Sequence, residues 1–111
     1  MSKSRRLGTL WEVAIVAGLR TRGWPHVERR ALAGKNDRGD IAGIPGVVIE
    51  AKNHKTITLA AWMDELATEK ANDNADVAAL WIKRRGKSRA IEGYVVLDGD
   101  SFIHLLREAG Y

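Results

Sequence analysis

The chain contains no cysteine among its 111 residues. Disulfide frameworks, zinc–thiolate centres and thiol nucleophiles are therefore excluded. No uninterrupted apolar run approaches the roughly 18 residues needed to cross a bilayer, so we expect no membrane partner. Residues 1–6 are not followed by a signal-type cleavage site, and Glu12 interrupts the apolar stretch behind them. We therefore expect a soluble intracellular protein.

Repeats, low-complexity segments and an internal linker are also absent from the sequence, which predicts a single domain over residues 1–111. Apolar periodicity and turn residues predict helices over residues 7–22, 59–71 and 102–109, and strands over residues 24–31, 39–44, 47–53, 76–83 and 93–97. The resulting order of elements is α-β-β-β-α-β-β-α, typical of an α/β fold with a mixed central sheet flanked by helices.

Acidic residues are outnumbered, because 18 Lys and Arg stand against 14 Asp and Glu for a net charge of +4. The basic residues are clustered, and such clusters are typical of proteins that bind a polyanion such as nucleic acid. A solvated surface without a partner is the alternative interpretation of any one cluster. The residues that we predict to contact DNA are Arg5, Arg6, Arg29, Arg30, Lys35, Arg38, His54, Lys83, Arg84, Arg85 and Lys87.

The most informative motif is Asp40 followed by Glu50-Ala51-Lys52. These charges stand at the ends of two short apolar runs joined by a Pro-Gly turn, so a hairpin would bring them together. Carboxylates held that close repel one another unless a cation lies between them. On a basic protein, a Mg²⁺ site of this kind beside a lysine indicates phosphodiester chemistry.

The length of the hairpin loop decides whether Asp40 and Glu50 can meet, because side chains alternate faces along a strand. A two-residue loop would place Asp40 opposite Ala51 and facing away from Glu50. A three-residue loop over residues 44–46 pairs Asp40 with Glu50. It also leaves Ile41, Val47, Ile49 and Ala51 as an apolar set on the other face. We therefore predict a three-residue loop or an equivalent bulge.

Glu12 is a candidate third carboxylate, because it lies at helical spacing from Gly8, Ile15 and Leu19 on an otherwise apolar face. A buried glutamate without a partner is costly and stays protonated. A metal ion or Lys52 would resolve that cost. The alternative is a glutamate at the helix edge that reaches water or pairs with an arginine.

The pattern of Asp40 and then Glu50-x-Lys52 on the next strand resembles the PD-(D/E)xK nuclease superfamily. With Gly8-Thr9-Leu10-Trp11-Glu12, the Gly23-Trp24 turn and the basic segment behind it, residues 7–97 resemble the small Holliday junction resolvases of archaea and phages. Gly39 stands where the superfamily name has proline. The glutamine often found in the following helix is absent; that helix carries Trp62, Glu65, Glu69 and Lys70 instead.

The resemblance implies a restriction-endonuclease-like fold and a Mg²⁺-dependent endonuclease, with Mn²⁺ able to substitute. It further implies a homodimer that nicks four-way or other branched DNA in the cytoplasm of a prokaryotic, archaeal or phage-infected cell. Asp40 and Glu50 match the metal ligands, Lys52 the catalytic lysine and Glu12 the helical glutamate that completes the site. The Ala51 carbonyl is a further candidate ligand. The alternatives are another nuclease of the superfamily, for replication-repair or restriction and recombination, and a DNA-binding module without activity.

Overall fold

The computed structural model describes residues 2–31 and 36–111. In these residues the observed order of elements, α-β-β-β-α-β-β-α, confirms the predicted α/β fold. No helix in the described ranges is long and apolar enough to cross a membrane. The elements are α1 (Lys3–Arg20), β1 (Glu28–Arg29), β2 (Ile41–Ala42), β3 (Val47–Lys52), α2 (Leu59–Asp73), β4 (Val77–Ile82), the 3-10 helix η2 (Ala90–Glu92), β5 (Tyr94–Leu97) and α3 (Gly99–Glu108).

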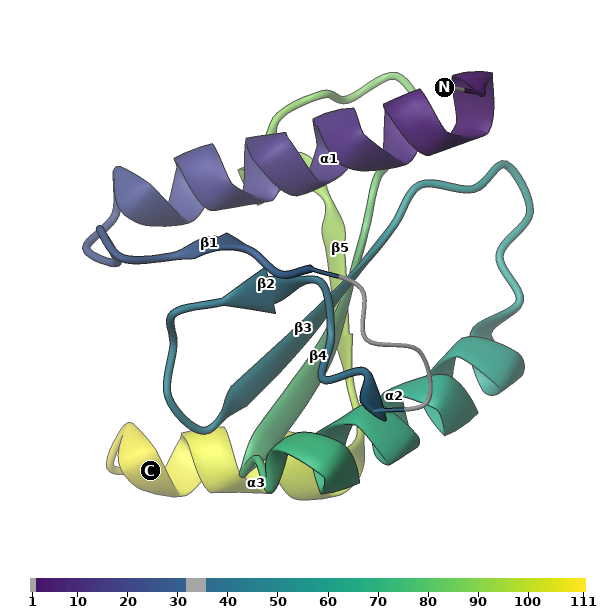
Figure 1. Cartoon of the computed structure of the whole chain (residues 1–111). Coiled ribbons are helices and arrows are strands. Elements are labelled where there is room, and N and C mark those ends of the chain that lie inside the picture. Colours follow the sequence, from purple (N-terminus) through teal and green to yellow (C-terminus); the bar gives the residue numbers. More distant parts are fainter. Residues whose placement is uncertain (1, 32–35) are drawn as a thin grey trace.

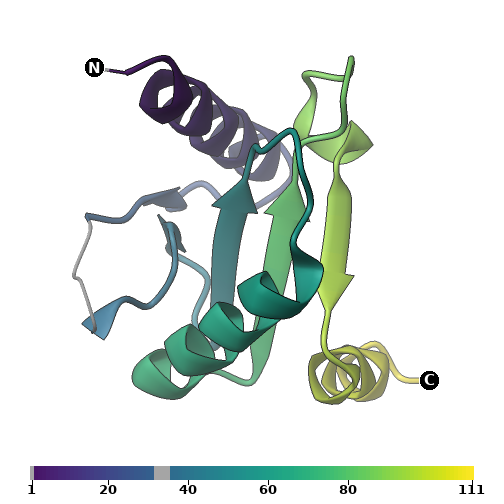
Figure 2. The ribbon, with the colours of Figure 1, turned by 90° about the vertical axis from the view of Figure 1, so that its right-hand side faces the viewer.

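The strands form one mixed sheet in the order β1-β2-β3-β4-β5. The pair β3 and β4 is parallel and every other neighbouring pair is antiparallel. Figure 2 shows β3 and β4 side by side in the same direction, with β5 running the opposite way. In Figure 1, α1 lies on one side of the sheet, and α2 and α3 lie on the other. The parallel pair requires a crossover, which α2 supplies.

Helix α1 begins at Lys3 rather than at the predicted residue 7. The side chain of Ser2 accepts a hydrogen bond from the Arg5 amide at 3.2 Å, which caps the helix four residues earlier than apolar spacing alone indicates. Trp11 and Ile15 then lie in the core between α1 and the sheet. The indole of Trp11 donates to the carbonyl oxygen of Trp81 at 2.9 Å, which fixes the helix against β4.

The hairpin between β2 and β3 has the predicted register. Ile41 pairs with Ile49, which places Asp40 opposite Glu50 across a three-residue loop. The amide of Val47 donates to the carbonyl oxygen of Ile44 at 3.2 Å and closes that loop. Ile41 and Ile49 consequently pack beneath α1, whereas Val48 packs beneath α2. Glu50 follows Val48 on the α2 face, as the alternation requires.

Gly43 is required by this hairpin for two reasons. Its φ of +107° lies in the region that favours glycine. A Cβ atom at this position would also lie 2.5 Å from the carbonyl oxygen of His26. The hairpin that presents Asp40 therefore lies directly against the chain that leads into β1.

Strand β1 is much shorter than the predicted strand over residues 24–31. Only Glu28 and Arg29 pair with β2. The preceding residues 24–26 form a turn around Pro25, which has no amide hydrogen to donate to a sheet. One apolar side chain from this region, Val27, is fully buried and packs in the core under α1.

Candidate metal centre

Three carboxyl side chains from separate parts of the chain converge beside β3. They are Asp37 in the segment before β2, Glu50 in β3 and Glu69 in α2. One carboxylate oxygen of each residue lies within 4.8 Å of those of the other two. Glu50 and Glu69 are only 8% and 7% exposed, and Asp37 is half-buried. We call these three residues the acidic cluster; it can hold a metal ion.

Burial makes the charged state of this cluster unfavourable without a cation. Desolvation is the largest cause raising the pKa of Glu50 far above its ordinary value of 4.5, and contacts with the carboxyl groups of Glu69 and Asp40 raise it further. Desolvation also raises the pKa of Glu69, although hydrogen bonding with Glu50 works in the other direction. Burial therefore favours the protonated form of both glutamates when no cation is bound.

Two oxygens of the cluster fit a cation. The Oε2 atoms of Glu50 and Glu69 are fully buried and have no hydrogen-bond partner in the described part of the chain. An unpaired buried carboxylate oxygen costs free energy that a bound cation removes. Oxygen donors without nitrogen or sulfur suit Mg²⁺, Mn²⁺ or Ca²⁺. The donor set is therefore consistent with the hard divalent cation predicted from the sequence.

Asp40 stands at the edge of the acidic cluster and is held by the backbone. Its Oδ2 atom accepts a hydrogen bond from the Ala51 amide at 2.8 Å, and its own amide donates to the Ile49 carbonyl at 2.9 Å. These bonds hold the carboxyl near Glu50, whose pKa the charge of Asp40 raises. The structure therefore joins Asp40 to the cluster through Glu50.

Lys52 lies next to the acids rather than in solvent. Its side chain is 13% exposed, and its Nζ atom lies 3.3 Å from Oε2 of Glu65. The same ammonium lies 5.4 Å from the centre of the Trp62 ring. Its charge also lowers the pKa of Glu69, against the larger effect of burial. Lys52 is thus a preorganised cation at the border of the acidic cluster.

Glu12 pairs with an arginine, which was the alternative to its role as a third carboxylate of the metal site. Nε of Arg29 lies 3.1 Å from its Oε1 atom. Glu12 is nevertheless close to the site: burial raises its pKa first, and the charge of Asp40 raises it further. It lies near Asp40 but is not one of the three carboxyl groups that converge in the acidic cluster.

Several residues predicted to contact DNA are engaged with the protein itself. Arg29 holds Glu12, and Arg38 lies 3.4 Å from Asp73 of α2. The amide of Arg30 donates to the carbonyl oxygen of Asp40 at 2.7 Å. Lys35 lies outside the described residues. The basic segment before the hairpin is thus partly structural, since it positions the site.

The remaining predicted contacts lie near the end of the sheet where β3 and β4 finish. Arg5 and Arg6 are exposed in the first turns of α1, and the ring of His54 lies 5.3 Å from that of Trp62. The connection from β4 to β5 carries the basic block. In it Lys83 is half-buried, Arg84 lies over the Tyr94 ring, Arg85 is exposed and Lys87 lies 3.9 Å from Glu92.

Asp37 and Glu69 were not predicted as site residues. Glu69 shares the buried face of α2 with Trp62 and Leu66, at spacings of seven and three residues, so the helical periodicity did contain its signal. Asp37 lies in an irregular segment, where its carboxylate accepts a hydrogen bond from the Gly39 amide at 3.0 Å. No periodic pattern marks a residue of that kind.

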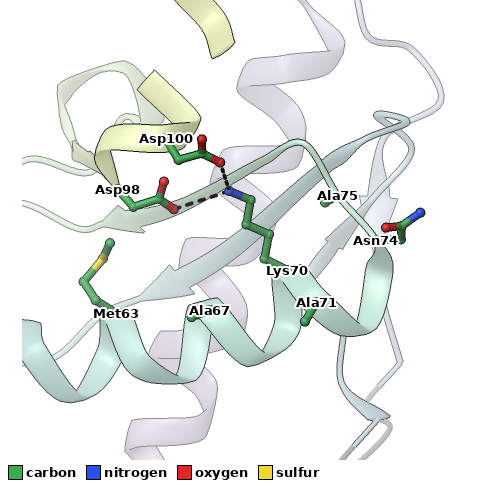
Figure 3. Close-up of a pocket in the computed structure, with 8 residues that line it drawn as sticks. All are labelled: Met63, Ala67, Lys70, Ala71, Asn74, Ala75, Asp98 and Asp100. Atoms are coloured by element: carbon green, nitrogen blue, oxygen red, sulfur yellow. Dashed lines mark hydrogen bonds and ion pairs between the residues drawn. The ribbon is translucent and has the colours of Figure 1, made fainter. Parts of the chain in front are cut away.

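An open pocket between α2 and α3 lacks the unpaired carboxylate oxygens of the acidic cluster. Its volume is about 570 Å³, and Figure 3 shows Lys70 reaching across it toward Asp98 and Asp100. The Nζ atom of Lys70 lies 3.8 Å from Asp98 and 3.2 Å from Asp100, so its charge is neutralised. The two acids clamp α3 onto α2, which is a structural role.

No family model, no curated protein and no solved structure matches the chain. The interpretation of the site therefore depends on its geometry and on the motif that Asp40, Glu50 and Lys52 form. Both lead to the same chemical class, a carboxylate site for a divalent cation with a lysine at its border.

Proposed function

We propose that the protein is a divalent-cation-dependent nuclease that hydrolyses phosphodiester bonds in DNA. The observation that carries this proposal is the pair of unpaired, buried oxygens of Glu50 and Glu69 beside Asp40 and Lys52. A structural salt bridge would pair such oxygens with an arginine or a lysine. A cluster left open to a cation, with one lysine at its border, instead suits chemistry on a charged phosphoryl group.

The residues present divide the work between them. Asp40, Glu50, Glu69 and Asp37 would hold Mg²⁺ or Mn²⁺, which when bound stabilises phosphoryl charge and lowers the pKa of a coordinated water. Lys52 is placed to neutralise charge that develops on a phosphoryl oxygen. The Ala51 amide keeps Asp40 oriented. The Ala51 carbonyl as a ligand, and Glu12 as the residue that completes the site, remain predictions.

The finer features of this function come from the sequence resemblance. Specificity for four-way or other branched DNA and assembly into a homodimer are proposed from the matches at Gly8-Thr9-Leu10-Trp11-Glu12 and at Asp40, Glu50 and Lys52. Two symmetric nicks need two sites, and one chain of this length carries one acidic cluster in its described part.

A cleavage assay with a panel of labelled DNA tests the proposal. The panel contains a four-way junction, a flap, a single strand and a linear duplex, each incubated with Mg²⁺, with Mn²⁺ and with EDTA. We expect cleavage with either cation and none in EDTA, with the four-way junction preferred at salt that weakens non-specific contacts. Failure to cut any substrate with either cation would overturn the nuclease. Equal cleavage of junction and linear duplex would overturn only the junction specificity.

A further inference from the structure

A basic pocket lies at the end of the sheet where β3 and β4 finish. Its volume is about 410 Å³. Figures 1 and 2 show the start of α1, the connection from β3 to α2 and the connection from β4 to β5 gathered there. The polar residues that line the pocket are Lys3, Ser4, Asn53, His54, Lys55 and Arg85, and no acidic residue in the described part of the chain lines it.

The cations of this pocket lack acidic partners. Lys3, Lys55 and Arg85 form no ion pair with any described residue. By contrast, Lys52 and Lys70 are each paired with carboxylates. Like charges that converge from three segments repel one another, and an anion in the pocket would relieve that repulsion. The hydroxyl and amide groups add neutral donors, so the set suits an oxyanion such as phosphate.

The pocket is built on the same strand end as the acidic cluster. Ala51 lines the pocket, and its amide donates a hydrogen bond to Oδ2 of Asp40 at 2.8 Å. Glu50 precedes it and points to the opposite face of the sheet. The amide side chain of Asn53 donates to the Leu7 carbonyl at 3.2 Å, which ties the wall of the pocket to α1. A group bound in the pocket is therefore held at a fixed position relative to the acids.

We propose that this pocket binds a backbone phosphate of the substrate DNA, separate from the phosphate that the acidic cluster acts on. The inference takes its nucleic acid substrate from the proposed function and adds the position of one contact. Lys55 and Arg85 bind the phosphate oxygens from two sides, and Lys3 adds charge from the start of α1. The contact sets the register of the strand without reading its bases.

The test compares the salt dependence of DNA affinity for two double variants. The pocket variant, Lys55→Ala with Arg85→Ala, removes two charges from the pocket. The control variant, Arg22→Ala with Arg107→Ala, removes one exposed charge from the segment after α1 and one from α3. Affinity for the four-way junction is measured in Ca²⁺ at 50 to 200 mM salt. We expect the slope of log affinity against log salt to become shallower by about 1 in the pocket variant and to stay unchanged in the control. Across that range the native protein should therefore lose roughly fourfold more affinity than the pocket variant.

Charge-preserving replacements separate contact from folding. Lys55→Arg with Arg85→Lys should restore the native slope, and thermal unfolding shows whether each variant is folded. An unchanged slope in the pocket variant, or an equal change in the control, would overturn the pocket. If the native protein cuts DNA but the pocket variant keeps the native slope, the phosphate contact in the pocket is refuted and the proposed nuclease activity is not. If the pocket variant has a shallower slope but the native protein cuts no DNA, the nuclease activity is refuted and the phosphate contact is supported.

Discussion

The Glu50→Gln variant is expected to unfold at a higher temperature than the native protein at pH 8 in EDTA. Glutamine keeps the shape of Glu50 and is neutral without a proton, whereas burial makes the folded protein hold a proton on Glu50 at a pH where the unfolded chain has released it. Relief of the cost of that protonation is worth about 1–2 kcal/mol, which corresponds to an increase of roughly 4–8 °C in Tm for a domain of this size. A glutamate with a purely structural role would instead lose stability on this change, which makes the prediction specific.

The sign of the pH dependence follows from the raised pKa of Glu50. Its folded-state pKa lies above the unfolded value of 4.5, so the folded protein binds the proton more tightly. The stability that this proton supplies is complete below pH 4.5 and is lost as the pH rises toward the folded-state pKa. Glu69 shifts in the same direction. The advantage of Glu50→Gln should therefore be small at pH 4.5 and grow as the pH is raised.

Thermal unfolding followed by circular dichroism, at several pH values and with EDTA or Mg²⁺, measures both effects. Mg²⁺ should raise the Tm of the native protein by more than it raises that of Glu50→Gln, because the stabilisation by a cation falls as its affinity for the folded state falls. Glu108→Gln, at an exposed position of α3, is the matched control. A Glu50→Gln protein that is less stable than the native one at pH 8 in EDTA would contradict the account.

Asp40→Asn is expected to lower the rate of DNA cleavage by about 10³-fold while leaving the fold in place. Asparagine keeps an oxygen that accepts the hydrogen bond from the Ala51 amide, so the orientation of the side chain survives. What disappears is the negative charge beside Glu50. Single-turnover cleavage of the four-way junction in Mg²⁺ measures the loss, and the stability should change by less than about 1 kcal/mol.

Asp64→Asn is the matched control for this variant, because Asp64 is an exposed acid on α2. It should cleave at the native rate. Asp40→Ala should lose stability as well as cleavage, since it also leaves the Ala51 amide without its acceptor. Cleavage by Asp40→Asn at the native rate would show that Asp40 has no role in catalysis, independently of the roles of the other acids.

The features that could be predicted from the sequence are those that a repeating pattern dictates. Alternation along the hairpin required Ile41 and Ile49 on one face and Glu50 on the other, and only an odd-length loop satisfied it. The order of helices and strands followed from the same periodicities. Glu12 shows the limit of this reasoning: its helical face was predicted, but its partner Arg29 lies 17 residues away on β1.

The composition of the acidic cluster could be predicted only in part. Glu50 belongs to the recognised motif, whereas Asp37 reaches the cluster from an irregular segment whose path depends on tertiary packing. Glu69 could have been found, since it shares the buried stripe of α2 with Leu66. A carboxyl on the buried stripe of a helix is a signal of function, because burial of a charge without a partner is costly.

Calorimetric titration with Mn²⁺ tests most directly whether the acidic cluster binds a divalent cation. We expect saturable binding to the native protein, with protons released because Glu50 must ionise. Proton release is measured by repeating the titration in buffers of different ionisation enthalpy. Glu50→Gln and Glu69→Gln should each weaken binding by roughly tenfold or more, and Glu108→Gln should leave it unchanged. Absence of saturable binding to the native protein, or equal affinity in all three variants, would contradict the account.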